Sequence, residues 1–118
     1  MAGTLIILVS VLAVLVTAGL TVLVMRNPTT GLAQLDHHIE HLPEVMAGRY
    51  LTFLVFALGA AIYGDPIVLF GLMVGFAVAS AADTFIYARQ GKKYGPHLAA
   101  GVASVVGAGL SLIAAGAS

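Results

Sequence analysis

Three residues with side chains suited to acid–base chemistry stand in or at the edge of largely apolar sequence: Arg49, Asp83 and His97. A charged residue deep in a membrane helix costs on the order of 2.5–3.5 kcal/mol, so we expect Asp83 to face the protein interior and to have a partner. Arg49 could bind an anion or polarise an oxygen atom, while Asp83 and His97 could exchange a proton. These residues are the predicted catalytic centre. The alternative is structural: an Arg49–Asp83 ion pair joins two helices, and His97 is an interfacial residue.

Further polar side chains flank these three residues in the sequence and complete a predicted pocket. Hydroxyl groups and one more cation are suited to binding the polar part of a ligand. The predicted ligand-binding residues are Tyr50, Thr84, Tyr87, Tyr94 and Arg89.

A second polar cluster lies in the sequence from Asp36 to His41. His37 and His41 are four residues apart and would share one face of a helix, with Glu40 beside them. Two imidazoles and a carboxylate can hold zinc or iron, so these three residues are weak candidates for metal ligands. A solvated polar face or a substrate gate would explain the same pattern. We predict no bound metal and no cofactor.

The composition indicates whether water or lipid surrounds the protein. Of 118 residues, 60% are hydrophobic and only 8% are charged, whereas a soluble domain has about a quarter charged residues. This excludes an ordinary soluble globular fold and predicts a lipid bilayer as partner. The absence of Cys excludes thiol chemistry, and a formal net charge of zero argues against binding to nucleic acid.

The apolar residues occur in four blocks, each long enough for one membrane helix. The predicted spans are residues 4–25, 45–63, 66–88 and 97–115. Between the first two spans, Leu32, Leu35, Ile39 and Leu42 recur at helical spacing and predict a short amphipathic helix over residues 30–42. The predicted fold class is therefore all-α: an integral membrane four-helix up-down bundle that forms a single transmembrane domain over residues 1–118.

Small residues recur on the last two predicted spans. Gly71, Gly75, Ala79 and Asp83 follow one another at four-residue steps, which would direct Asp83 into a packed seam between helices. The fourth span has a similar surface made of Gly101, Ser104, Gly107 and Ala108. Four short helices bury little surface, so we expect a homo-oligomer, a dimer or a trimer, with these surfaces as interfaces.

The positive charges indicate the orientation in the membrane. All five cationic residues lie in or beside the first and third connections between spans: Arg26, Arg49, Arg89, Lys92 and Lys93. Cytoplasmic loops are enriched in Lys and Arg, so these connections should be cytoplasmic and both termini should lie outside. The predicted location is a bacterial inner membrane.

The second half of the chain resembles a group of small bacterial and fungal four-helix membrane proteins that are broadly DoxX-like. The resemblance covers about residues 45–110. That group has an Arg early in the second helix, an Ala-Asp pair late in the third, a basic loop, and a His at the start of the fourth. Arg49, Ala82-Asp83, Arg89 and His97 match this pattern. The resemblance implies a fold but no activity, because the group has none assigned.

Taken together, these features predict a protein that binds a lipophilic or amphiphilic small molecule in a polar pocket at the cytoplasmic side. Acid–base chemistry, such as isomerisation or epoxide opening, would suit the three central residues, so the sequence leaves open whether the protein is an enzyme. Two alternatives remain at this point. One is a proton- or ion-linked transporter that uses Asp83 as the carrier site, and the other is a structural or accessory membrane subunit.

Overall fold

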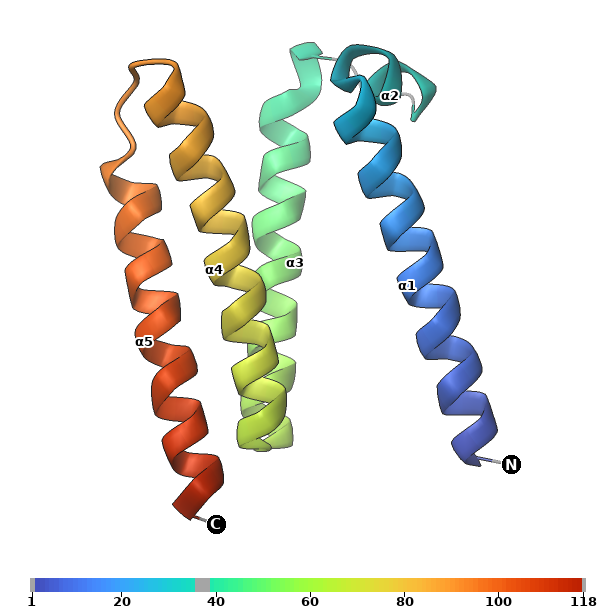
Figure 1. Cartoon of the computed structure of the whole chain (residues 1–118), viewed down its shortest axis with the longest axis vertical. Helices are drawn as coiled ribbons and strands as arrows, with labels where there is room; N and C mark the ends of the chain where they lie inside the picture. The colour runs from blue at the N-terminus through green and yellow to red at the C-terminus, as the bar shows by residue number, and fades with distance from the viewer. Residues whose placement is uncertain (1, 36–38, 118) are drawn as a thin grey trace. The chain divides into compact units, whose positions relative to one another are not determined.

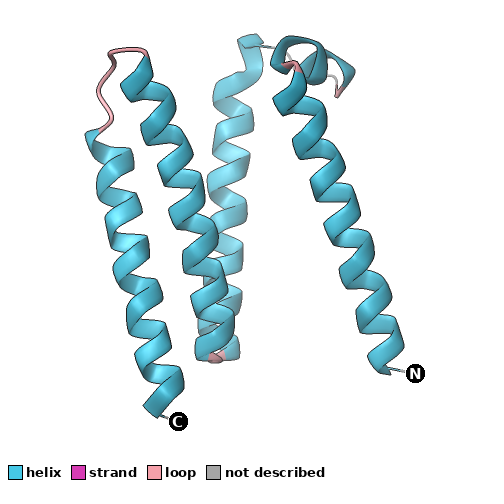
Figure 2. Cartoon of the chain, in the orientation of Figure 1, coloured by secondary structure: helices cyan, strands magenta, loops and turns pink. Residues whose placement is uncertain are grey.

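The computed structural model describes residues 2–35 and 39–117. The described residues form helices and turns, with no strand among them (Figure 2). Contacts divide the chain into two compact units, Met1–Gly48 and Arg49–Ser118. We describe each unit by itself.

The first unit contains α1 (Ala2–Arg26) and the short helix α2 (Pro28–Gln34). Asn27 is the N-cap of α2, and its side chain accepts a hydrogen bond from the Thr30 backbone N–H at 3.2 Å. Gly31 lets α2 fold back against the end of α1, because a Cβ atom there would lie 2.7 Å from the Leu23 carbonyl oxygen. Close backbone contact therefore fixes this corner.

The segment between the first two predicted spans differs from the single amphipathic helix expected over residues 30–42. The described residues form α2, which starts two residues earlier, and a 3-10 turn η1 (Ile39–His41). Local capping explains the early start, because Asn27 and Pro28 provide an N-cap and a first helical residue. Leu42 does not end an amphipathic helix but begins the next long helix. Residues 36–38 lie outside the described part of the chain.

The second unit contains most of α3 (Leu42–Tyr63), then α4 (Pro66–Arg89) and α5 (Gly95–Ala117). Short connections reverse the chain after α3 and again after α4, so that α4 runs antiparallel to both neighbours (Figure 1). The beginning of α3 from Arg49 onward, the end of α4 and the beginning of α5 therefore lie at the same end of this unit. This arrangement brings Arg49, Asp83 and His97 to the same end of the three helices.

A two-residue connection joins α3 to α4. Gly64 follows α3 with φ +76°, a left-handed conformation that glycine adopts without strain, and its N–H donates to the Ala60 carbonyl at 2.9 Å. Asp65 then caps α4: its Oδ1 accepts hydrogen bonds from the N–H groups of Ile67 at 2.7 Å and Val68 at 3.3 Å. Pro66 occupies the first turn of α4, as its fixed φ favours.

The helices α4 and α5 pack closely because small residues line their contact. A Cβ atom on Gly107 would lie 3.0 Å from the Met73 sulfur, and one on Gly101 would lie 3.4 Å from the Ser80 Cβ. Ser104, Ala108 and Ser111 are buried on the same face of α5. The predicted small-residue surface of this helix is thus in contact with α4 of the same chain.

On α4, only part of the predicted small-residue stripe faces a neighbouring helix. Asp83 and Ala79 are partly buried, whereas Gly71 and Gly75 are exposed and have nothing near the position of a Cβ atom. The reason is geometric: a four-residue step turns an α-helix by about 400°, so three steps drift about 120° around its axis. The seam predicted over the whole stripe is therefore limited to its last two members.

The large apolar side chains of the second unit point mostly outward. Ile62 is 86% exposed, and the buried apolar residues among those described are the small Ala60 and Ala108. Three described helices, α3, α4 and α5, are long and apolar enough to cross a membrane. In α1, the described residues give a shorter apolar helix, Val11–Arg26.

Candidate functional site

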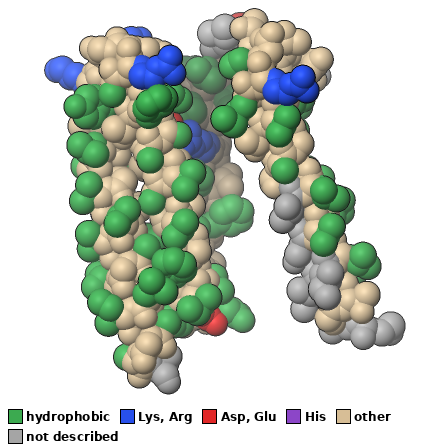
Figure 3. Space-filling view, viewed as in Figure 1, with side chains coloured by type: hydrophobic (Ala, Val, Ile, Leu, Met, Phe, Trp, Pro, Cys, Tyr) green, Lys and Arg blue, Asp and Glu red, His purple; other side chains and the backbone are tan. Residues whose placement is uncertain are grey.

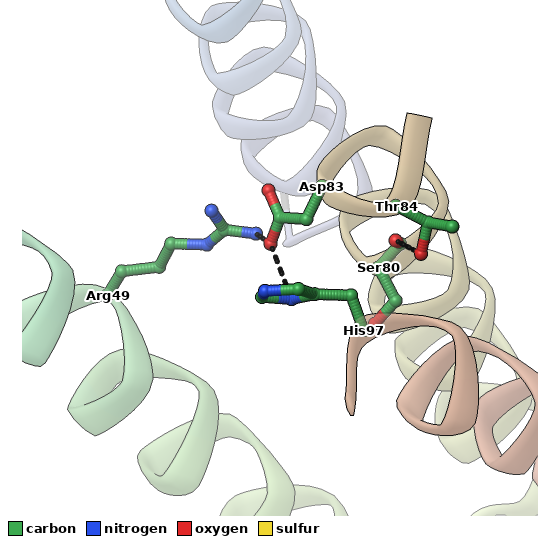
Figure 4. A network of polar contacts seen from close by, with 5 residues as sticks. All are labelled: Arg49, Ser80, Asp83, Thr84 and His97. Atoms are coloured by element: carbon green, nitrogen blue, oxygen red, sulfur yellow. Dashed lines mark hydrogen bonds and ion pairs between the residues drawn. The ribbon is translucent and has the colours of Figure 1, made fainter. Parts of the chain in front are cut away.

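The candidate site lies where α3, α4 and α5 meet, at the end of the second unit that carries the α4–α5 connection. Arg49 extends from α3, Asp83 from the last third of α4, and His97 from the first turn of α5 (Figure 4). All three side chains are partly buried, with exposed fractions of 31%, 19% and 29% respectively. The structure thus brings together the three residues of the predicted centre.

A single oxygen atom of Asp83 faces both basic side chains. Arg49 Nη2 donates to Asp83 Oδ2 at 3.4 Å, and His97 Nδ1 lies 3.7 Å from the same oxygen. Charge-assisted hydrogen bonds between nitrogen and carboxylate oxygen are usually about 2.7–2.9 Å long. The two contacts are therefore loose and are shared by one acceptor, and neither involves Asp83 Oδ1 (Figure 4).

Aromatic rings hold the two basic groups. The Arg49 guanidinium carbon lies 5.3 Å from the centre of the Phe53 ring and 6.0 Å from that of Tyr50. Such cation–π contacts stabilise a guanidinium that has lost part of its water. The His97 imidazole is stacked on the Tyr87 ring, with centroids 5.0 Å apart and planes at 22°. Both basic groups are thus positioned by rings as well as by Asp83.

A cavity of about 180 Å³ adjoins these groups. Four of its lining residues were predicted from the sequence as site residues: Arg49, Asp83, His97 and Tyr50. The others come from all three helices and were not predicted as site residues, although Ala79 and Ser104 were expected in packing surfaces: Phe53, Phe76, Ala79, Ser80, Ala100 and Ser104. Helical spacing was the available signal, because these residues lie three, four or seven positions from one of the three central residues.

Three of these additional residues make contacts that define the cavity wall: Phe53, Phe76 and Ser104. The Phe53 and Phe76 rings are 5.0 Å apart and join α3 to α4. The Ser104 hydroxyl donates to the Ala100 carbonyl of its own helix at 2.7 Å, so its hydrogen is already used. The cavity therefore has one cluster of ionisable groups on a mostly apolar wall.

The predicted ligand-binding residues separate into two groups. Tyr50 lines the cavity and Tyr87 stacks on His97. Thr84 lines an apolar groove on another face of α4 and donates to the Ser80 carbonyl at 2.7 Å. Arg89 lies over the Phe85 ring and Tyr94 is exposed in the connection before α5, so neither lines the cavity.

The His-rich segment is only partly described. His37 lies outside the described residues, while Glu40 and His41 belong to η1. His41 Nδ1 is 3.9 Å from Glu44 Oε2, and both side chains are exposed. Among the described residues, no three His, Cys, Asp or Glu side chains are close enough to hold a metal ion.

Comparisons with known proteins leave this site without a relative. No protein-family model matches the chain, and no curated protein or solved structure matches it. The DoxX-like resemblance thus stays a prediction.

Proposed function

We propose that this chain is a small integral membrane protein that binds an amphiphilic small molecule in the cavity between α3, α4 and α5. The observation that carries the proposal is the loose sharing of Asp83 Oδ2 by Arg49 and His97 beside a cavity of about 180 Å³. A purely structural ion pair gains most from short, well-satisfied contacts and from close packing around it. Long contacts next to a cavity favour a site that exchanges one partner for a ligand.

The composition and the outward-facing side chains support a bilayer as the surroundings. A soluble protein rarely exposes such extensive apolar surface, and lipid is the solvent that this surface suits. We propose that α1 is a fourth membrane span. With four spans, the distribution of Lys and Arg favours a cytoplasmic site and external termini. We propose a bacterial inner membrane as the location and a homo-oligomer as the assembly.

The size of the cavity limits the ligand. Sites for drug-sized molecules usually measure about 300–1,000 Å³, and an apolar cavity of about 150 Å³ can hold benzene. The polar group of the ligand should therefore be no larger than a six-membered ring. The apolar tail of the ligand would remain outside the cavity, among the exposed apolar side chains of the helices.

The ionisable groups define the chemistry of that polar group. Arg49 can donate to an oxygen atom such as a carbonyl, carboxylate or epoxide oxygen. Asp83 can accept from a hydroxyl, and His97 can take or give the proton that such a group exchanges. If the protein is an enzyme, this set supports isomerisation or epoxide opening, with His97 as acid or base and Arg49 stabilising negative charge on oxygen.

The polar groups at the opposite end of the same unit argue against a transport function. Transport through this unit would need polar groups that lead from Asp83 to the other end. Asp65 already accepts two backbone hydrogen bonds, and Ser111 donates to the Gly107 carbonyl at 2.8 Å. Both groups are used within their own helices, so binding is the better supported proposal.

The test is to identify what the protein carries when it is purified. The full chain should be isolated in mild detergent, and its lipophilic contents should be extracted and analysed by liquid chromatography and mass spectrometry. We expect one small amphiphile to be enriched with the wild-type protein. The Asp83→Asn and Arg49→Ala variants should lose this amphiphile, because each substitution removes a contact to the polar group of the ligand.

Matched controls separate the site from the general effect of a lost charge. Asp65→Asn and Arg26→Gln remove the same charges elsewhere and should retain the molecule. If the site variants and the control variants carried the same molecules as the wild type, the proposed binding site would be refuted.

A further inference from the structure

A second candidate binding surface lies on another face of the α4–α5 pair. An apolar groove of about 610 Å³ runs along both helices, from Ala77 and Val106 towards Ala88 and Leu98. Its lining contains one hydroxyl, that of Thr84, and this group is bonded within α4. The groove therefore suits a hydrocarbon chain.

Small side chains form part of the lining of this groove. Ala77, Ala81 and Gly101 lie along its length, and the larger Phe85, Val102 and Val105 also line it. The two helices come close together beside the groove, because a Cβ atom on Gly101 would lie 3.4 Å from the Ser80 Cβ. The groove is thus lined by both helices, as a binding surface for one extended acyl chain requires.

The end of the groove reaches the basic connection between α4 and α5. The Arg89 guanidinium carbon lies 5.3 Å from the centre of the Phe85 ring, which itself lines the groove. Lys92 and Lys93 follow within four residues, and Figure 3 shows Lys and Arg side chains gathered at this end of the helix pair. Arg89 therefore lies against a residue that lines the groove, and Lys92 and Lys93 belong to the connection that follows α4.

The backbone of this connection has a defined conformation. Gly91 adopts φ +65°, its N–H donates to the Ala88 carbonyl at 3.1 Å, and the Lys92 N–H donates to the Tyr87 carbonyl at 2.9 Å. This pair of hydrogen bonds is a Schellman motif, which ends α4 in a fixed geometry. The two lysines are therefore presented close to the end of the helix.

We infer that this surface binds an anionic phospholipid, with one acyl chain in the groove and the phosphate at Arg89, Lys92 and Lys93. Charge complementarity selects this occupant: a basic cluster at the level of the headgroups attracts anionic lipid, and each cation contributes about fivefold to affinity. A helix of a second copy would leave the three cations without a partner. The inference requires membrane placement of α4 and α5 but does not require the cavity at Asp83.

Native mass spectrometry of the full chain in dodecyl maltoside tests this inference. Palmitoyl-oleoyl phosphatidylglycerol is the anionic probe, and palmitoyl-oleoyl phosphatidylcholine is the neutral one. We expect the anionic lipid to be retained at least tenfold more strongly. The Lys92→Gln/Lys93→Gln double variant should lose at least tenfold in retention of the anionic lipid, with retention of the neutral lipid unchanged. Micelles have no sides, so a change in membrane orientation does not affect this measurement.

A second pair of variants tests the groove itself. Ala81→Leu places a larger side chain in the groove and should weaken retention of both lipids, whereas Ala82→Leu on the neighbouring face should not. Arg26→Gln, a cation of the other unit, should leave lipid retention unchanged. Asp83→Asn should also retain the anionic lipid. Loss of ligand binding in the cavity can therefore be distinguished from loss of lipid binding in the groove.

Two results would overturn the inference. One is an equal preference of the wild type and the double-lysine variant for the anionic lipid. The other is an Ala81→Leu variant that retains lipid normally but dissociates from a dimer into a monomer, because the groove would then be an interface between copies.

Discussion

The two aspartates of the second unit have opposite environments. Asp65 stands at the end where α3 turns into α4, and its carboxylate is bonded to two backbone N–H groups of its own helix. Asp83 stands near the other end, and its carboxylate faces side chains of two other helices. The contacts of Asp65 are local in sequence, whereas those of Asp83 cross distances of 34 and 14 residues.

This difference shows what each charge contributes. The Asp65 contacts at 2.7 and 3.3 Å satisfy a helix terminus, a need that every helix has. The Asp83 contacts are 3.4 and 3.7 Å long, satisfy no helix terminus, and lie beside a cavity. One aspartate therefore has a complete structural explanation, and the other has an incomplete one that binding of a ligand would complete.

The largest effect on stability is expected from Arg49→Ala. The variant leaves the Asp83 carboxylate with only His97 beside it, in a partly buried position. Removing one partner of a fully buried ion pair costs 3–5 kcal/mol, so at this exposure we expect a loss of about 2–3 kcal/mol in the free energy of unfolding. Titration with sodium dodecyl sulfate, followed by circular dichroism, measures that loss.

A double variant sharpens this test. Arg49→Ala combined with Asp83→Ala removes the uncompensated charge together with its partner, so the double variant should be more stable than Arg49→Ala alone. Additive losses would show that the two side chains act independently, which contradicts the account of a shared carboxylate.

A smaller effect is expected from Gly107→Val, which lies in the contact between α4 and α5. The added atoms would displace Met73, since even a Cβ atom would lie 3.0 Å from its sulfur. We expect a loss of about 1–2 kcal/mol, as for other overpacked contacts. Gly75→Val, on an open face of α4, is the matched control and should be nearly neutral in the same titration. Equal losses at both glycines would contradict the packing described for α4 and α5.

The smallest effects concern Asp65. Asp65→Ala removes the N-cap and should cost about 1 kcal/mol, whereas Asp65→Asn retains an acceptor oxygen and should change stability by only a few tenths of a kcal/mol. Thermal unfolding of the detergent-solubilised variants measures both. A large loss in the Asn variant would indicate that the charge of Asp65 has a role beyond capping, and the contrast with Asp83 would then be invalid.

The parts of the structure that the sequence could predict depend on strong local or energetic rules. The all-helical structure and the three long apolar helices follow from length and hydropathy. The meeting of Arg49, Asp83 and His97 follows from antiparallel order and from the high cost of an unpaired charge. The turn at Gly64-Asp65-Pro66 follows from the conformational preferences of its residues.

The other features depend on which direction a side chain takes around its helix. Thr84 follows Asp83 directly, but one residue turns a helix by about 100°, so its side chain lines a different face. Over the twelve residues from Gly71 to Asp83, the rotation of about 100° per residue leaves their side chains about 120° apart around the helix. Between residues 30 and 42, the apolar spacing suited a continuous helix, yet the capping residues Asn27 and Pro28 determine where α2 starts. Side-chain proximity in sequence was therefore a poor guide to proximity in space.

An experimental density map of the wild-type protein in lipid nanodiscs would show whether a ligand occupies the cavity beside Asp83. The account predicts non-protein density in the cavity beside Asp83, in contact with Arg49 or His97, and predicts that the Asp83→Asn variant lacks it. A wild-type map with a short Arg49–Asp83 ion pair and side chains filling the cavity would contradict the account, because the contacts of Asp83 would then be complete without a ligand.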